Sequence, residues 1–119
     1  MALYLNGKRV VSSGYEEVVL YSGTNPNLYS YPLSDSISNY DLIWVMANRQ
    51  GQSAKYGGST MVPSSYLISI MPNVSYIGIC TDDKFLFFSA SNETTMNKMD
   101  ASDLYITKII GIRWGIKTA

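Results

Sequence analysis

The sequence predicts an all-β fold, an antiparallel β-sandwich of jelly-roll-like form with about eight strands. Three observations predict it. Val, Ile, Tyr, Phe and Thr dominate the ordered stretches, no window of a dozen residues keeps a helical apolar period, and turn signals recur at regular spacing. A closed barrel is the alternative arrangement of such strands. The chain has 119 residues, which is enough for one core and too short for two.

The first elements are an N-terminal hairpin over residues 1–15 and then the start of a sandwich domain over residues 16–119. Asn6-Gly7 lies between two short apolar runs and is a strong signal for a two-residue turn, because both positions tolerate positive φ. Glu16–Ser22 is the next extended run, and Leu28–Leu33 follows it. Pro32 cannot donate to a strand ladder, so this second strand is expected to end there or to lie at an edge.

The middle of the chain alternates between polar connections and apolar strands. Ser34–Tyr40 is a polar connector whose Ser and Asp residues suit the cap of a short helical turn. Asp41–Asn48 reads as a central, apolar strand. Arg49–Thr60, with three glycines and two glutamines, is predicted to be the longest loop and the best place for function on the scaffold.

The second half of the chain is predicted to contain four more strands. Tyr66–Met71 and Ser75–Cys80 are joined around Pro72-Asn73, and Phe85–Ala90 returns after a turn. A polar stretch, residues 91–103, precedes the last long strand, which runs from Leu104 to about residue 116.

Three of these strands are apolar on both faces, whereas a sandwich strand alternates apolar and polar residues. In the central strand, for example, Trp44 and Met46 point one way and Val45 points the other. A chain this small has too little interior to bury both faces, so the second faces predict a homo-oligomer. A one-residue phase shift at bulges is the alternative explanation. The candidate interface residues are Trp44, Met46, Phe87, Ile110, Ile112 and Trp114.

Charge and composition exclude several classes of function. Nine basic and nine acidic residues leave no basic excess for binding nucleic acid. No apolar stretch is long enough to span a membrane, and no signal peptide is recognisable, so the chain is expected to be made in a cytoplasm. With no histidine and the single cysteine Cys80, no metal site, disulfide or other cofactor is expected.

The sequence also argues against an enzyme. No Ser-His or Cys-His pair is possible without histidine, so nucleophilic catalysis of that type is excluded. Paired carboxylates of a glycosidase are conceivable, but Asp82-Asp83 reads as a turn and Glu16-Glu17 as the entry to a strand. A small glycan-active enzyme that uses Asp82, Asp83 or Glu16 is therefore the least favoured alternative.

The remaining possibility is a surface for recognition. Ten tyrosines, sixteen serines and eight asparagines offer flat rings and adaptable hydrogen bonds, which suit sugars or protein partners. The aromatic candidates are Tyr29, Tyr31, Tyr40, Tyr56, Tyr66, Tyr76 and Trp114, each of which is individually more typical of a half-buried strand residue. The residues predicted as a group to bind ligand are Asn48, Arg49, Gln50, Gln52 and Tyr56.

Two stretches resemble structural proteins of bacteriophages and prophages. Glu17–Gly23, Tyr31–Tyr40 with its Leu-Ser-Asp-Ser-Ile-Ser-Asn-Tyr run, and the apolar strand after it look like the opening of a β-sandwich module in tail or head fibres. Thr107–Ile112 is similar to the way such modules end. The resemblance implies a trimer in the virion that binds the host surface or decorates the particle, and it brings no catalytic residues.

This chain departs from the fibre pattern because it has no shaft. The hairpin that follows Met1 favours a small stand-alone virion protein, whose N-terminal segment would attach it to other virion proteins. The leading expectation is a fibre or spike module that recognises a bacterial surface ligand, a carbohydrate, without catalysis. A head fibre or capsid decoration protein with a purely structural role is the second expectation.

Overall fold

The computed structural model describes residues 4–49, 57–71, 77–81, 84–99 and 104–118. Within these residues the chain forms nine strands, one α-helix and one 3-10 turn. In chain order they are β1 (Tyr4–Leu5), β2 (Lys8–Ser22), β3 (Ser30–Pro32), the 3-10 turn η1 (Ile37–Asn39), β4 (Leu42–Arg49), β5 (Gly58–Pro63), α1 (Ser64–Ser69), β6 (Ile77–Thr81), β7 (Lys84–Asn92), β8 (Thr95–Lys98) and β9 (Leu104–Thr118).

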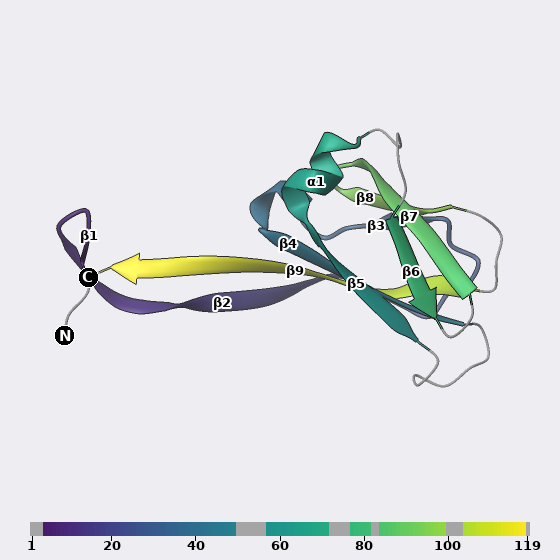
Figure 1. The fold of residues 1–119 in the computed structure, drawn as a ribbon, viewed down its shortest axis with the longest axis horizontal. Coiled ribbons are helices and arrows are strands. Elements are labelled where there is room, and N and C mark those ends of the chain that lie inside the picture. The colour runs from purple at the N-terminus through teal and green to yellow at the C-terminus, as the bar shows by residue number, and fades with distance from the viewer. Residues whose placement is uncertain (1–3, 50–56, 72–76, 82–83, 100–103, 119) are drawn as a thin grey trace.

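The strands form two antiparallel sheets (Figure 1). One sheet has the order β1-β2-β9-β4-β5, and the other has the order β3-β8-β7-β6. The helix α1 follows β5 and lies against β7 and η1. The structure confirms that the chain is mostly β and that it forms two antiparallel sheets in a sandwich-like arrangement.

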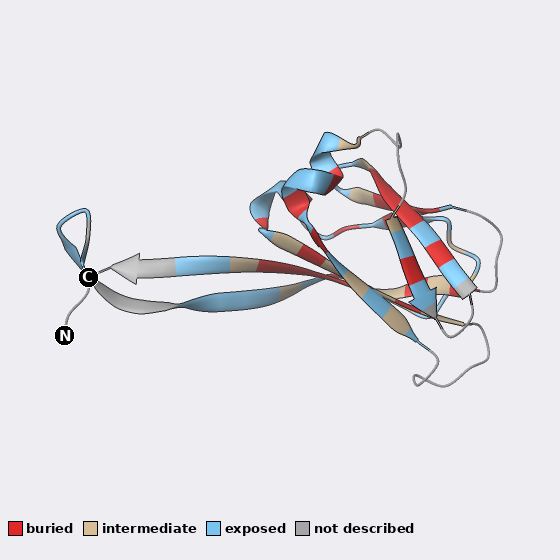
Figure 2. Cartoon of the chain, in the orientation of Figure 1, coloured by how far each residue is buried: buried red, intermediate tan, exposed pale blue. Residues whose placement is uncertain are grey.

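The core lies between the two sheets. In β4 the buried residues alternate with half-buried ones, so that Ile43, Val45 and Ala47 face inward. Leu86 and Phe88 of β7 are buried opposite them in the same hydrophobic cluster, as the red segments of Figure 2 indicate. Both sheets therefore contribute one apolar face to a single core.

A two-stranded ribbon projects from this body. Strands β2 and β9 each have 15 residues and pair from Ser22–Lys108 to Val10–Thr118, whereas β4 leaves β9 after Leu42–Ile112. We call the ribbon from the pair Tyr15–Trp114 outward the arm, and the hairpin Tyr4–Arg9 at its end the arm tip. The arm gives the molecule its elongated dimensions of 54 × 31 × 22 Å (Figure 1).

The predicted turn at Asn6-Gly7 forms the arm tip. Asn6 has φ 52° and Gly7 has φ 78°, and the flanking residues pair as Tyr4–Arg9 and Leu5–Lys8. Two successive positive φ values are what a two-residue hairpin needs, because they match the right-handed twist of the strands. This part of the sequence prediction is confirmed.

Three further predictions of elements are confirmed. Pro32 ends β3, which lies at the edge of its sheet, and β4 lies in the interior of the other sheet between β9 and β5. Ser36 caps η1 by accepting a hydrogen bond from the Ser38 amide. Pro32 predicts the edge strand, a serine predicts the cap, and the apolar run of β4 predicts its central position.

A period of two along the last strand predicts that Leu104, Ile106, Ile110, Ile112 and Trp114 share a face, and this prediction is wrong beyond Ile106. A register shift in the β4–β9 pairing leaves Thr107 without an opposite residue, because Met46 pairs with Lys108 and Ala47 pairs with Ile106. A bulge of this kind exchanges the two faces of a strand. Leu104 and Ile106 therefore share the core with Ile109, whereas Ile110 and Ile112 are on the opposite face.

The strand predicted over Tyr66–Met71 is also wrong, because the structure has α1 there. Pro63 has φ −57° and precedes the first helical turn, where its missing amide N–H costs nothing. Ser64 and Leu67 are buried, and Tyr66 and Ile68 between and after them are exposed. That spacing of three is a helical face in a run whose apolar residues resemble a strand.

Two strands were missing from the prediction. Strand β5 begins at Gly58, inside the stretch predicted to be a loop, and a Cβ at Gly58 would lie 2.2 Å from the carbonyl oxygen of Cys80 in β6. Strand β8 lies inside the polar stretch, where Met96 and Lys98 are buried and Thr95 and Asn97 are not. Arg49 ends β4 and so belongs to a strand, and residues 50–56 lie outside the described part of the chain.

Candidate functional site

The candidate site is the face of the five-stranded sheet that points away from the core, which we call the outer face. Residues directly opposite one another in antiparallel strands share a face. Trp44 is opposite Ile110 in β9 and Met61 in β5, and Ile110 is opposite Val19 in β2. By the same rule the outer face comprises Tyr15, Glu17, Val19, Leu42, Trp44, Met46, Ser59, Met61, Pro63, Lys108, Ile110, Ile112 and Trp114.

The first cavity on this face lies where β4, β5 and β9 run side by side near the bulge. Its volume is about 320 Å³, and its walls are formed by Trp44, Met46, Ala47, Asn48, Gly57, Gly58, Ser59 and Thr107. Thr107 donates a hydrogen bond from Oγ1 to the carbonyl oxygen of Met46, 3.3 Å away. The bulge thus adds the hydroxyl-bearing Thr107 to the lining that also contains Trp44, and two glycines form part of the same wall.

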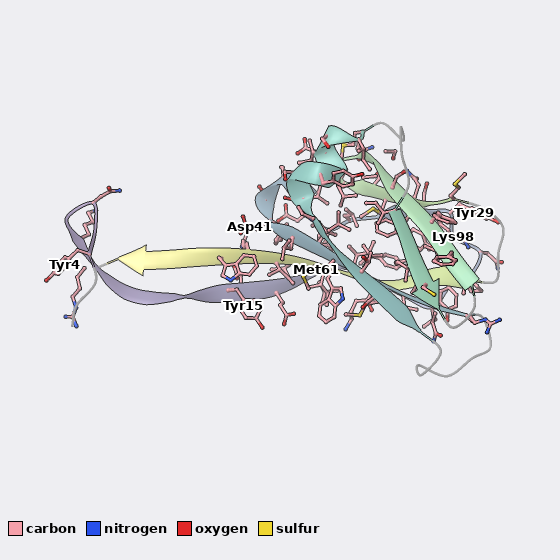
Figure 3. The ribbon with its side chains drawn as sticks, viewed as in Figure 1. Tyr4, Tyr15, Tyr29, Asp41, Met61 and Lys98 are labelled. Carbon is pink, nitrogen blue, oxygen red and sulfur yellow. The ribbon has the colours of Figure 1, made fainter. Side chains whose placement is uncertain are left out.

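The second cavity lies at the base of the arm. It has a volume of about 250 Å³ and is lined by Tyr15, Glu17, Leu42, Trp44, Met61, Ile112 and Trp114. Tyr15 and Trp114 are opposite each other with ring centroids 6.2 Å apart, and Figure 3 shows Tyr15 close to Met61. Glu17 is the charged group among the lining residues. Trp44 lines both cavities, so they adjoin across its ring.

The structure places two of the five predicted ligand residues. Asn48 and Arg49 are half-buried at the end of β4, and Asn48 lines the first cavity. Asn48 Oδ1 accepts a hydrogen bond of 2.8 Å from the Arg49 amide. Gln50, Gln52 and Tyr56 lie outside the described residues.

The predicted interface residues do not form one surface. Trp44 and Met46 are half-buried on the outer face and Trp114 is 56% exposed there. Ile110 and Ile112 share that face but are only 7% and 4% exposed, because neighbouring side chains cover them. Phe87 is exposed on β7 of the other sheet, where it stacks on Phe85.

The aromatic candidates separate into buried and exposed residues. Tyr31 and Tyr40 belong to the core cluster, so their rings are not platforms for a ligand. Tyr31 donates to the Leu28 carbonyl oxygen and accepts from the Ile106 amide, and burial raises the pKa of its phenol. Tyr29, Tyr66 and Trp114 are exposed, and Tyr56 and Tyr76 lie outside the described residues.

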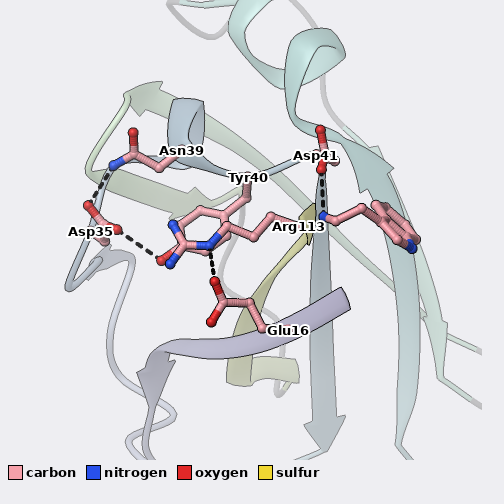
Figure 4. A network of polar contacts seen from close by, with 7 residues as sticks. Glu16, Asp35, Asn39, Tyr40, Asp41 and Arg113 are labelled. Carbon is pink, nitrogen blue, oxygen red and sulfur yellow. Dashed lines mark hydrogen bonds and ion pairs between the residues drawn. The ribbon is translucent and has the colours of Figure 1, made fainter. Parts of the chain in front are cut away.

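A polar network fastens the base of the arm to the body (Figure 4). The Asp35 carboxylate accepts hydrogen bonds from Tyr40 Oη, the Ser36 amide and Asn39 Nδ2, and these hold its pKa below the ordinary value. Burial and the bond to Asp35 raise the pKa of Tyr40. The Arg113 guanidinium lies 5.1 Å from the centre of the Tyr40 ring.

Arg113 and Asp41 extend this network onto the arm. Arg113 Nε donates to Glu16 Oε1, which raises the pKa of the guanidinium, and both side chains are exposed. The Asp41 amide donates to the Ile112 carbonyl oxygen, and Asp41 Oδ2 accepts from the Trp114 amide at 3.0 Å (Figure 4). Asp41, the residue before the first residue of β4, thereby occupies the edge of β9 at the point where the pairing of β4 with β9 stops.

The carboxylates considered for metal binding or catalysis do not gather in the part of the chain that the structure describes. No group of three or more His, Cys, Asp or Glu residues comes together in that part. Glu16, one of the carboxylates considered for an enzyme, is bound to Arg113, and Asp82 and Asp83 lie outside the described part.

Sequence reasoning missed three important residues of the outer face, namely Tyr15, Glu17 and Met61. Tyr15 and Glu17 precede the apolar part of β2. Met61 lies in β5, a strand that the sequence did not predict. Alternation along β2 was the available signal, since Tyr15, Glu17 and Val19 are spaced by two residues.

Comparisons with known protein families, with curated proteins and with solved structures find no match to this chain. The helix α1 has six residues, and the part of the chain that the structure describes contains no helix long and apolar enough to cross a membrane.

Proposed function

We propose that this chain is a structural module of a bacteriophage virion, a fibre or spike module that recognises a carbohydrate on the bacterial surface without catalysis. The observation that carries the proposal is the first cavity, whose lining combines Trp44 with the polar residues Asn48, Ser59 and Thr107. Sugars present apolar C–H faces and hydroxyl groups, which an indole ring and neighbouring polar groups match.

The volume and the lining of the first cavity support a binding role over an enzymatic one. The volume of about 320 Å³ is at the small end of ligand pockets, as expected for a site that holds one or two sugar rings. The described residues that line the cavity include no carboxylate, and so they supply neither the acid nor the base that glycoside hydrolysis requires.

The proposal is tested by binding of the whole chain to an array of bacterial surface polysaccharides. Trp44→Ala is expected to lower the affinity for the bound glycan at least tenfold, because stacking on the ring is lost. Asn48→Ala is expected to lower this affinity less. Phe85→Ala is the matched control, since this exposed ring lies on the other sheet. A chain that binds neither glycans nor host cells contradicts the proposal.

A head fibre or capsid decoration protein is the second candidate, favoured by the exposed aromatic part of the outer face. Tyr15, Met61 and Trp114 are 60%, 47% and 56% exposed, and an apolar area of this kind is typical of a contact with another protein. Co-purification with capsids, in the absence of glycan binding, would favour this candidate.

The wider assignment is part of the same proposal. We infer a homotrimer with a jelly-roll-like arrangement, made in the host cytoplasm and located in the virion, with residues 1–15 contacting other virion proteins. Hydrolysis of host polysaccharide that Asp82→Asn abolishes would instead support the enzyme alternative.

A further inference from the structure

We propose that the arm tip of one copy docks in the second cavity of a neighbouring copy, with Arg9 placed next to the neighbour's Glu17 and Lys8 adding to the positive charge of the tip. The inference rests on the proposed self-association and names the two surfaces that meet. It adds Tyr15, Glu17 and Met61 on one side, and Tyr4, Lys8 and Arg9 on the other, to the residues that hold the oligomer together.

The second cavity is suited to a cation with an apolar neighbour. Its walls are the rings of Tyr15, Trp44 and Trp114 with the aliphatic side chains of Leu42, Met61 and Ile112. Ring faces attract cations that lie within about 6 Å of their centres. Glu17 is exposed at this site and forms no ion pair with another residue that the structure describes.

The arm tip offers the complementary chemistry. Tyr4 is 66% exposed, and Lys8 and Arg9 are exposed on the adjoining strand. Neither cation has an ion-pair partner in the described part of the chain. Tyr4 and Arg9 lie opposite each other and share a face of the tip, so one ring and one cation meet a cavity of three rings and one carboxylate, and Lys8 on the other face adds to the charge of the tip. An ion pair enclosed by aromatic side chains is screened less than one in open water.

The tip of a chain does not reach the cavity of the same chain. Arg9 and Glu17 lie on one extended strand, and at about 3.3 Å per residue they are roughly 26 Å apart. Figure 3 shows Tyr4 at the far end of the arm and Tyr15 at its base. The occupant of the cavity is therefore another molecule.

The arm itself favours a second copy as that molecule. A two-stranded ribbon is only marginally stable in water, and this one extends away from the body with no third strand beside it among the described residues (Figure 1). Docking of its tip would fix the ribbon at both ends. The formal net charge of zero means that long-range repulsion does not oppose association of identical chains.

Charge reversal tests the contact. Glu17→Lys alone and the double change Lys8→Glu with Arg9→Glu are each expected to weaken self-association at least tenfold, measured by light scattering across a concentration series. Mixing the two variants is expected to restore part of it, because the tip of one variant then meets a cavity of opposite charge in the other. A closed ring of three copies holds two such contacts and one contact between like charges. Glu93→Lys, an exposed glutamate on the β7–β8 turn, is the matched control.

A disulfide trap tests the geometry. In a Cys80→Ser background, Arg9→Cys combined with Glu17→Cys is expected to give covalent oligomers on mild oxidation, because thiols roughly 26 Å apart in one chain cannot bond with each other. Arg9→Cys combined with Glu93→Cys is expected to give none.

The outcomes separate the two proposals. A wild-type chain that stays monomeric at all concentrations contradicts self-association and the docked arm together. An oligomer that withstands both charge reversals and forms no trapped disulfide contradicts the docked arm alone and leaves self-association through another surface.

Discussion

The ring of Tyr40 lies against the backbone of Gly111, in the space that a side chain at this position would fill. A Cβ at Gly111 would be 2.6 Å from two atoms of the ring, and Arg113, two residues further along β9, lies beside the same ring. The aromatic ring covers a strand glycine and replaces the packing that the glycine lacks.

Gly111→Ala is expected to destabilise the fold by about 1–3 kcal/mol, because the Tyr40 ring and its bond to Asp35 must shift. The matched control is Gly115→Ala in the same strand, where no atom lies within 4 Å of the added Cβ. That change is expected to stay within about 0.5 kcal/mol. Urea unfolding measures both, and equal effects would show that Tyr40 does not depend on the glycine.

Lys98 is a buried cation with carbonyl partners. Its Nζ donates to the Leu104 oxygen at 2.9 Å and to the Pro26 oxygen at 3.3 Å, and it lies 4.7 Å from the centre of the Tyr29 ring (Figure 3). It thereby joins β8 to the start of β9 and to the loop before β3.

Lys98→Met is expected to cost about 1–3 kcal/mol of unfolding free energy, since the carbonyl oxygen of Leu104 loses a donor in a buried position. The length of the side chain is kept, so packing changes little. Lys108→Met, a half-buried lysine on the outer face of β9, serves as the control in the same urea series. A Lys98→Met variant as stable as the control would contradict a structural role for the ammonium group.

The Asp35 carboxylate makes stability depend on pH in the acid range. Its folded-state pKa is held below the ordinary value of about 3.9 by Tyr40, Ser36 and Asn39. As the pH falls, the unfolded chain therefore binds the proton first, and this contribution to stability, complete above about pH 4, is lost below it.

Tyr40→Phe removes the first of these hydrogen bonds and is expected to raise the pKa of Asp35 toward its ordinary value. An NMR titration of the carboxyl carbon measures the shift directly. Asn39→Ala, which removes a smaller contribution, is expected to raise it less. A pKa unchanged by either substitution would contradict the assignment of these bonds.

At the scale of elements, Asp41 determines where the five-stranded sheet becomes the arm. Its carboxylate binds the Trp114 amide, which would otherwise be an unpaired donor at the edge of β9. Asp41→Ala is expected to speed hydrogen exchange of the Trp114 amide at least tenfold and to destabilise the chain by about 0.5–1.5 kcal/mol. Asp41→Asn keeps an acceptor oxygen and is expected to preserve most of the protection, so equal exchange in both variants would argue against this bond.

The elements that the sequence predicts well are those with a strong local signal. Asn6-Gly7 requires positive φ at two positions, and Pro32 removes a donor, so the hairpin and the edge strand follow from single residues. β8 was not predictable in this way, because the partners that hold Lys98 in its buried position include carbonyl groups of other segments, Pro26 among them. β5 begins at a glycine that is needed for the close approach of Cys80 in β6, which is a tertiary constraint.

The candidate site was predictable only in part for the same reason. The position of Trp44 on the outer face follows from alternation in β4, and Asn48 follows from the end of that strand. The bulge at Thr107 changes the face of Ile109 and Ile110, and nothing in their local sequence marks it. Tyr15 and Trp114 become neighbours only through the pairing of two strands that are about a hundred residues apart.

At the scale of the whole molecule, docking between copies would couple folding to assembly. The thermal midpoint of the wild-type chain is then expected to rise by roughly a few degrees for each tenfold increase in concentration, because association draws the equilibrium toward the folded state. Scanning calorimetry over such a series measures it. Glu17→Lys is expected to make the midpoint independent of concentration, and a wild-type midpoint without any such dependence would argue against coupled assembly.

The pairing of β2 with β9 gives the arm a direction-dependent resistance to mechanical force. Val10 and Thr118 lie opposite each other at the far end of the ribbon. A force that pulls these two strands apart loads one hydrogen-bonded pair at a time, so the ribbon opens like a zipper at low force. Opposite forces along the two strands load all the pairs together in shear. A load directed along the arm would therefore be carried by all the pairs together. A load that pulls one strand away from the other would open the arm pair by pair.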